Sequence, residues 1–151
     1  MTGKRLATEV VWNDFYALEL PEIDAQHQTL FSIINDLWMA VMAKNEAIGI
    51  EAILDRLEAY ALIHFSAEEA LMRDINYPRL DEHKRAHQRF VEQVVAAKEH
   101  WRAGEPIGFA MLDFLNGWLV DHILTVDKDY AAHYARSGQP LSLLAQFFPG
   151  E

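Results

Sequence analysis

Four long stretches of the sequence place apolar residues three or four positions apart, and only short breaks separate them. The stretches cover about residues 24–43, 47–73, 79–102 and 109–136. The breaks contain the segments Lys44-Asn45-Glu46, Asn76-Tyr77-Pro78 and Gly104-Glu105-Pro106. This spacing is that of one face of an α-helix, and helices joined by short connections pack in antiparallel pairs. The sequence therefore predicts an all-α, up-down-up-down antiparallel four-helix bundle, about residues 24–136, within a single domain spanning 1–151.

Two terminal segments fall outside this pattern. Residues 1–22 lack sustained helical spacing and predict an extended N-terminal arm, after which Asp24 is expected to cap the first helix. Residues 138–151 form a short apolar C-terminal extension, whose large side chains are Leu143, Leu144, Phe147 and Phe148. Such an extension either covers the bundle or, through 141–148, contacts a protein partner or a second copy of the chain. Covering the bundle is the simpler interpretation.

Charge and cysteine content exclude several classes of function. The chain carries 13 basic and 23 acidic residues, for a net charge of −10, which argues against binding to nucleic acid or anionic lipid. It contains no cysteine, which excludes a disulfide framework, a thiolate metal site and an iron–sulfur cluster. No signal peptide and no unbroken apolar run of about 20 residues is present, so we expect a cytoplasmic protein that does not insert into a membrane.

Five of the seven histidines lie on the apolar faces of the four predicted helices. They are His27, His64, His83, His87 and His122. Glu68 follows His64 by one helical turn and therefore shares its face. A single histidine on a helix is most often an ordinary core or surface side chain. Five histidines that face one interior from four helices require a different explanation.

These residues also stand at the same height in the predicted bundle. His27 lies 18 residues before Asn45 in the first connection, and His64 lies 19 residues after it. Glu68 pairs with His87 about the second connection in the same way, and His87 pairs with His122 about the third. At about 1.5 Å per residue, all of them fall in one layer within about one helical turn.

Such a layer of buried imidazoles indicates a metal site. Burial of imidazole is costly unless its ring nitrogens have partners, and a metal ion supplies partners for several rings at once. Imidazole and carboxylate without sulfur suit iron, manganese, zinc or copper. Five imidazoles exceed what one ion with an open position would bind, so two ions bridged by carboxylates are favoured. Glu68 is the first candidate bridge.

The second bridge should come from the fourth helix, near His122. Asp121 points about 100° away from His122 and is disfavoured. Asp127 lies about 140° around an ideal helix from His122, so a local widening of the helix would be needed. Asp129 faces the right way but stands about 10 Å farther along the helix. Helical geometry therefore prefers Asp127 over Asp129 only modestly.

The motifs that carry these residues, in this order and spacing, resemble the hemerythrin family, most closely the bacterial hemerythrins. They are Ile23-Asp24-Ala25-Gln26-His27, His64-Phe65-Ser66-Ala67-Glu68-Glu69, His83-Lys84-Arg85-Ala86-His87, and Trp118-Leu119-Val120-Asp121-His122-Ile123 followed by Asp127. The resemblance covers roughly residues 10–135. It implies two iron ions with an oxo or hydroxo bridge.

The resemblance also implies a role for each ligand. One iron would be bound by His83, His87 and His122, and the other by His27 and His64. Glu68 and Asp127 would bridge the two ions, which leaves one coordination position open for dioxygen. An apolar pocket would surround that position, formed by Leu30, Phe65, Trp118, Leu119 and Ile123. The expected function is reversible dioxygen binding by a carrier, store or sensor that is not an enzyme.

Two alternatives remain at this point. A di-iron enzyme with peroxidase, oxidase or nitric oxide reductase activity would use the same ligands, and Tyr60 or Tyr130 could supply its proton. No histidine has a glutamate three residues before it, which excludes the Glu-x-x-His pattern of ferritin-like oxidases. A regulatory module is the other alternative, in which the metal state would alter residues 138–151.

Overall fold

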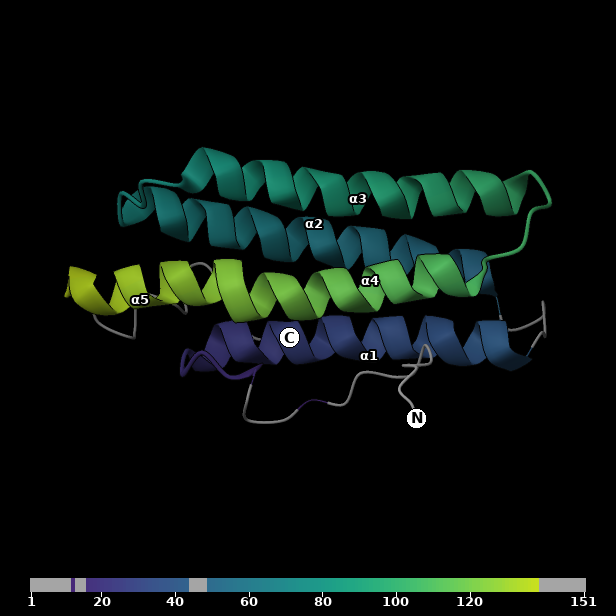
Figure 1. Cartoon of the computed structure of the whole chain (residues 1–151), viewed down its shortest axis with the longest axis horizontal. Helices are drawn as coiled ribbons and strands as arrows, with labels where there is room; N and C mark the ends of the chain where they lie inside the picture. The colour runs from purple at the N-terminus through teal and green to yellow at the C-terminus, as the bar shows by residue number, and fades with distance from the viewer. Residues whose placement is uncertain (1–11, 13–15, 44–48, 139–151) are drawn as a thin grey trace.

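The computed structural model describes residue 12 and residues 16–43 and 49–138. Its helices are α1 (Pro21–Ala43), α2 (Ile50–Asp74), α3 (Leu80–Arg102), α4 (Phe109–Asp121), the π-helix η3 (His122–Asp127) and α5 (Lys128–Ser137). The last three follow one another without a break and form the fourth rod of the bundle (Figure 1). Each rod packs against two neighbours, since α1 contacts α2 and α4, and α3 contacts the same two helices. The predicted all-α four-helix bundle is therefore confirmed.

The predicted N-cap at Asp24 is wrong, and the second helix begins later than predicted. Helix α1 begins at Pro21, and Asp24 lies inside its first turn, where its Oδ1 accepts the backbone N–H of Leu18 at 2.9 Å. Proline suits a first helical position because the missing N–H would have no helical partner there. Helix α2 begins at Ile50, later than expected, because Gly49 has a φ of 83° that an α-helix cannot contain.

The buried apolar side chains form two clusters with the predicted ligands between them. The larger cluster contains Leu30, Phe65, Phe90, Leu119 and Ile123 among its members. The smaller cluster, near the α2–α3 turn, comprises Leu20, Ile23, Leu71, Met72, Ile75, Tyr77, Tyr130 and Tyr134. Along every rod the ligand positions lie between residues that pack in the smaller cluster and most residues of the larger cluster. The layer predicted from residue counts therefore crosses the whole bundle.

Parts of the predicted terminal segments lie outside the described residues. Of the N-terminal arm, Trp12 and Tyr16 are described, and both rings lie within 5.7 Å of the Phe31 ring, measured between centroids. The first connection, residues 44–48, is not described. The C-terminal extension is described only to Gly138, so the predicted contact through 141–148 lies outside the described residues.

One helical run meets the length and composition of a membrane span, contrary to the sequence-based expectation. This run is Phe109–Ser137. It contains an 18-residue segment whose mean hydropathy, 1.2, and low number of charged residues are those of a helix that could cross a membrane. The earlier expectation considered unbroken apolar runs, whereas this segment contains His122 and other polar side chains. The buried core helix of a soluble protein has the same length and composition, so this helical run is weak evidence for a membrane span. Absence of membrane insertion stays a prediction.

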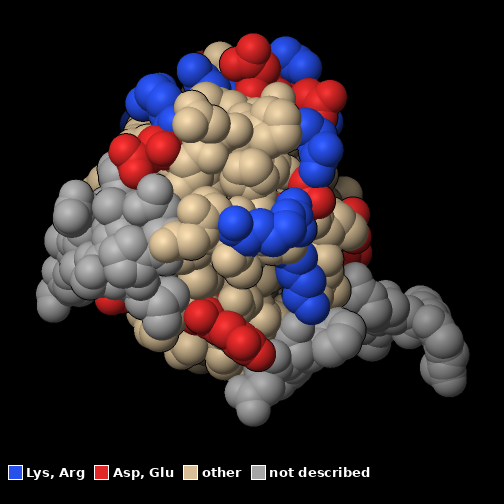
Figure 2. Space-filling view, turned by 90° about the vertical axis from the view of Figure 1, so that its left-hand side faces the viewer, with Lys and Arg blue, Asp and Glu red and all other residues tan. Residues whose placement is uncertain are grey.

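Acidic and basic side chains are interspersed with uncharged surface at the end of the bundle that carries the α2–α3 turn and α5 (Figure 2). The net charge of −10 is therefore not concentrated on this face.

Candidate metal centre

The structure buries all seven predicted ligands in the layer between the two apolar clusters. None of them is more than 5% exposed; they are His27, His64, Glu68, His83, His87, His122 and Asp127. All four rods contribute, because the seven residues come from α1, α2, α3 and η3. Burial of so many ionisable groups is costly unless they interact closely with each other or with a cation.

The donor atoms fall into two groups that share Glu68. One group comprises Glu68, His83, His87, His122 and Asp127, and the other comprises His27, His64 and Glu68. Within each group, the donor atoms lie within 4.8 Å of one another. Glu68 joins the groups through its two oxygens: Oε1 is 3.1 Å from His87 Nε2, and Oε2 is 3.1 Å from His64 Nε2.

Asp127 joins the two groups in the same way. Its Oδ1 lies 3.0 Å from His83 Nε2 and 3.2 Å from His122 Nε2. Its Oδ2 lies 3.1 Å from His27 Nε2, in the second group. The structure thus places two carboxylates, one from α2 and one from η3, where each faces histidines of both groups.

The π-helix explains how Asp127 reaches the layer. Five residues separate it from His122, and the widened turn η3 runs between these two residues. In a π-helix the repeating hydrogen bond connects residues five apart, which brings the two side chains onto one face. Asp129 points elsewhere and forms short contacts with Tyr77 and Arg79. The local widening that the sequence required for Asp127 is present, and Asp121 is exposed.

The inward-facing donor atoms fit metal ions. Four of them are buried without a hydrogen bond: His27 Nε2, His87 Nε2, Glu68 Oε1 and Asp127 Oδ1. In addition, the Nε2 atoms of His83 and His122 face each other at 3.1 Å. Buried polar atoms are rarely left in this state. A cation in each group would give these atoms a partner, and sulfur-free imidazole and carboxylate donors suit iron.

The electrostatics of the cluster favour a bound cation. The pKa values of Glu68 and Asp127 lie well below their usual range, because the facing histidines outweigh the opposing effect of burial. Burial lowers the pKa of His27, but Asp127 and Glu68 outweigh it and raise the value to about 9. Burial likewise lowers the pKa of His87, whereas Glu68 and Glu69 raise it to about 9. Both carboxylates therefore stay ionised and attract either protons on the histidines or metal ions.

Three further residues hold the predicted ligands from outside, and the sequence interpretation assigned none of them this role. His64 Nδ1 donates to Gln26 Oε1 at 2.7 Å, and His87 Nδ1 donates to Glu69 Oε2 at 2.9 Å. The Tyr130 hydroxyl donates to Glu68 Oε2 at 2.7 Å. Gln26 and Glu69 are chain neighbours of predicted ligands, and Tyr130 lies on the apolar stripe, but spacing alone did not reveal their partners.

Two aromatic rings lie flat against the histidines on the side of the larger cluster. Phe65 stacks on His87 with centroids 3.9 Å apart and an interplanar angle of 4°. Trp118 stacks on His122 at 4.3 Å and 13°. Of the predicted pocket residues, Leu30, Phe65, Leu119 and Ile123 are buried in this cluster, and Trp118 packs against it partly exposed. Their role around a ligand stays a prediction.

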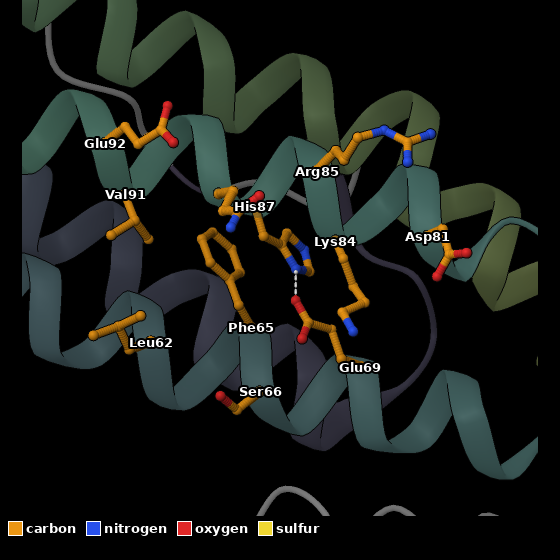
Figure 3. A pocket seen from close by; sticks show the side chains of 11 residues that line it. Leu62, Phe65, Ser66, Glu69, Asp81, Lys84, Arg85, His87, Val91 and Glu92 are labelled. Carbon is orange, nitrogen blue, oxygen red and sulfur yellow. Dashed lines mark hydrogen bonds and ion pairs between the residues drawn. The ribbon is translucent and has the colours of Figure 1, made fainter.

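A groove of about 550 Å³ between α2 and α3 reaches the layer from outside. Figure 3 shows the ring of His87 and the carboxylate of Glu69 at its floor, beside Phe65. The remaining two histidines lie away from the layer. His100 is exposed and contacts Glu105, and His133 Nε2 lies 3.0 Å from the carbonyl of Ile75.

Comparison with known proteins agrees with this arrangement. The family "Hemerythrin HHE cation binding domain" matches residues 19–134. A bacteriohemerythrin of Stenotrophomonas maltophilia is 32% identical over 81% of this chain and 79% of its own length. One from Pseudomonas aeruginosa is 34% identical over 80% of this chain and 78% of its own length. A bacteriohemerythrin of Clostridium acetobutylicum is 33% identical over 80% of this chain and 97% of its own length.

A solved structure shows the same fold. The crystal structure of a wild-type hemerythrin superposes with a TM-score of 0.76, at 29% identity over 83% of this chain and 97% of that chain. A family match over most of the chain, together with a buried cluster of histidines and carboxylates that fits a di-iron site, leads to one conclusion. The chain belongs to the hemerythrin family.

Proposed function

We propose that this protein holds two iron ions in the buried layer and binds dioxygen reversibly there, as a carrier, store or sensor. The observation that supports the proposal is the unequal division of ligands. One position is faced by His83, His87 and His122 together with both carboxylates, and the other by His27 and His64 with the same two carboxylates. The second position has one protein ligand fewer and leaves room for a ligand from outside.

Each residue of the layer has a defined part in this proposal. The histidines hold the ions through Nε2, and Glu68 and Asp127 face both positions at once. Two ferrous ions, when bound, supply the electrons with which dioxygen is held reversibly. Tyr130 donates its hydrogen bond to Glu68 Oε2, the oxygen nearer His64, and so holds this carboxylate in place on the side of the open position.

The apolar side of the layer supports binding of a small uncharged molecule. Leu30 lies one turn after His27, and Phe65 directly follows His64. Both are buried, and Leu119, Ile123 and the partly exposed Trp118 belong to the same cluster. Apolar walls admit dioxygen and disfavour water and anions.

Reversible binding is favoured over catalytic turnover because Tyr130, the hydroxyl that contacts the carboxylate of Glu68, does not give up its proton readily. Tyr130 is fully buried, and burial, followed by the charges of Glu68 and Asp127, raises its pKa well above 10.0. Its hydroxyl already donates a hydrogen bond to Glu68 Oε2. Tyr130 therefore acts as a hydrogen-bond donor in this proposal and does not act as a general acid.

The test combines iron analysis with an optical spectrum. The iron-loaded protein is reduced without air, exposed to air, and then freed of dioxygen again. We expect two irons per chain and a visible absorption that appears with dioxygen and disappears after its removal, over repeated cycles. Irreversible oxidation, or sustained consumption of an added reductant, would favour the enzyme alternative instead.

A pair of histidine variants locates the site in the same assay. His64→Ala removes a predicted ligand, and we expect fewer than two irons and loss of the reversible absorption. His100→Ala removes an exposed histidine outside the layer, and we expect two irons and an unchanged spectrum. Equal iron content in the two variants would contradict the ligand assignment.

A further inference from the structure

We propose that Glu69 and Gln26 are positioning residues that make the two metal positions electronically unequal, a proposal that rests on the proposed di-iron site. Glu69 holds His87 through a negatively charged carboxylate, and Gln26 holds His64 through a neutral amide. The position with three histidines thereby gains an anion in its outer surroundings. Dioxygen is proposed to bind at the position with two histidines. Gln26, the partner of His64 at that position, adds no charge.

The geometry determines which atom donates in each pair. His87 Nε2 points toward Glu68 Oε1 at 3.1 Å, and His64 Nε2 points toward Glu68 Oε2 at the same distance. With Nε2 turned to the layer as the ligand atom, the ring proton must be on Nδ1. Each Nδ1–H therefore donates outward, to Glu69 Oε2 at 2.9 Å and to Gln26 Oε1 at 2.7 Å.

The two acceptors differ in strength. A hydrogen bond to an ionised carboxylate is roughly twice as strong as one between neutral groups. The carboxylate also raises the basicity of the histidine that ligates the metal. His87 is thus a stronger electron donor than His64, and the negative charge of Glu69 favours the more positive, oxidised state of the ion beside it.

The burial of the two partners explains why the partner of His87 carries a charge and the partner of His64 does not. Gln26 is 5% exposed, and a carboxylate at its position would lose most of its hydration. The Glu69 side chain is 21% exposed and opens into the α2–α3 groove. Lys84 and Arg85 line the same groove (Figure 3). The Glu69 carboxylate thus contacts a buried ligand while it opens to solvent and shares the groove with two basic side chains.

The decisive experiment compares two isosteric variants of the iron-loaded protein. Glu69→Gln removes the charge but keeps an acceptor for His87. Glu92→Gln removes the same charge from the same groove, at an exposed residue that is absent from the ligand layer. Midpoint potentials are measured without air by spectroelectrochemistry, so dioxygen binding is not required. Thermal unfolding of each variant verifies that the fold is retained.

We expect Glu69→Gln to favour the reduced state about tenfold, which corresponds to about 59 mV for a one-electron couple. Glu92→Gln should change the potential several times less. Equal shifts in the two variants would overturn the proposal, because a general surface-charge effect would then explain both. Gln26→Glu should shift the potential in the opposite direction, and an upward shift like that of Glu69→Gln would overturn the unequal roles.

A second readout avoids iron redox chemistry. The protein is loaded with Co²⁺, and its visible ligand-field spectrum and metal content are recorded for wild type, Glu69→Gln and Glu92→Gln. A changed spectrum with two ions still bound in Glu69→Gln, and an unchanged one in Glu92→Gln, supports the positioning role. If the wild type bound fewer than two ions, both this inference and the di-iron site would fail. Loss of reversible dioxygen binding alone, with the potential shifts present, would overturn only the proposed function.

Discussion

The larger apolar cluster and the ligand layer beside it are stabilised in different ways. The cluster contains fully buried Leu37, Leu54, Phe90 and Leu115, and removal of their apolar surface from water stabilises it. The layer buries seven ionisable side chains in the same bundle, at positions where apolar residues would pack without any cofactor. One part of this fold is therefore stabilised by apolar packing alone, whereas the other concentrates histidines and carboxylates in an arrangement that suits bound cations.

Truncation of a core side chain should have the largest effect and should leave metal binding intact. Phe90 is 0% exposed and packs edge-on against Phe65, with ring centroids 5.8 Å apart. We expect Phe90→Ala to reduce the free energy of unfolding by about 3–5 kcal/mol, because it leaves a cavity. Urea unfolding measures the loss, and metal analysis should still find two ions. A loss of metal ions with little loss of stability would contradict the separation of the two regions.

Metal removal should reverse this pattern. At a free metal concentration a thousand times the dissociation constant, bound ions stabilise the native state by about 4 kcal/mol. We therefore expect chelation to lower the unfolding free energy by about this amount in both wild type and Phe90→Ala. Thermal unfolding with and without a chelator, for both proteins, tests this additivity. An unchanged melting temperature after verified metal removal would show that the layer needs no cation.

The metal-free layer should also depend on pH, with a sign that follows from its pKa shifts. His27 and His87 have pKa values of about 9, above the ordinary histidine value of 6.5, so their stabilisation is complete below pH 6.5 and lost as pH rises through 9. Glu68 and Asp127 have pKa values well below the ordinary values of 4.5 and 3.8, so their contribution is present above those values and lost at lower pH.

Urea unfolding at pH 5.5, 6.5 and 9.5 checks this prediction. Burial lowers the pKa of His64, so its contribution is lost as pH falls below 6.5, whereas those of His27 and His87 are lost at high pH. Metal-free protein should therefore be most stable near pH 6.5 and less stable at pH 9.5. The metal-loaded protein should show the opposite trend on acidification, because metal ligands must be deprotonated. Metal-free protein that is as stable at pH 9.5 as at pH 6.5 would contradict the idea that protons on the histidines stabilise the layer when metal ions are absent.

The smallest expected effect comes from one hydrogen bond at the edge of the layer. Tyr130→Phe removes the hydroxyl that donates to Glu68 Oε2, without changing the shape of the buried ring. We expect a loss of about 1.5–3 kcal/mol, typical of a hydrogen bond to a charged group. Tyr134→Phe, in the same smaller cluster, is the control, since it removes the same hydroxyl group one helical turn farther from Asp127 along α5. Equal losses in the two variants, measured by urea unfolding, would argue against a specific role for Tyr130.

The residues that could be identified from the sequence share one property: they occur at regular helical spacing along the chain. Leu30, Ile34 and Leu37 recur with helical spacing, and residue counts from the turns placed His27 level with His64. Because the rise per residue of an α-helix is nearly constant, such residue counts give the distance along the helix directly. The role of Asp24 could not be found in this way, because its side chain accepts a hydrogen bond from Leu18, which lies outside the helix.

The amino-acid sequence by itself determined the four helices, their antiparallel order and the height at which the histidines face each other, because all three follow from local periodicity. Only the tertiary structure decided that η3 widens to bring Asp127 inward, while Asp129 contacts Tyr77 and Arg79. Only the packing of α2 against α1 and α3 pairs Gln26 with His64 and Glu69 with His87. These contacts join neighbouring helices at specific side-chain orientations, and no repeat in the chain encodes such orientations.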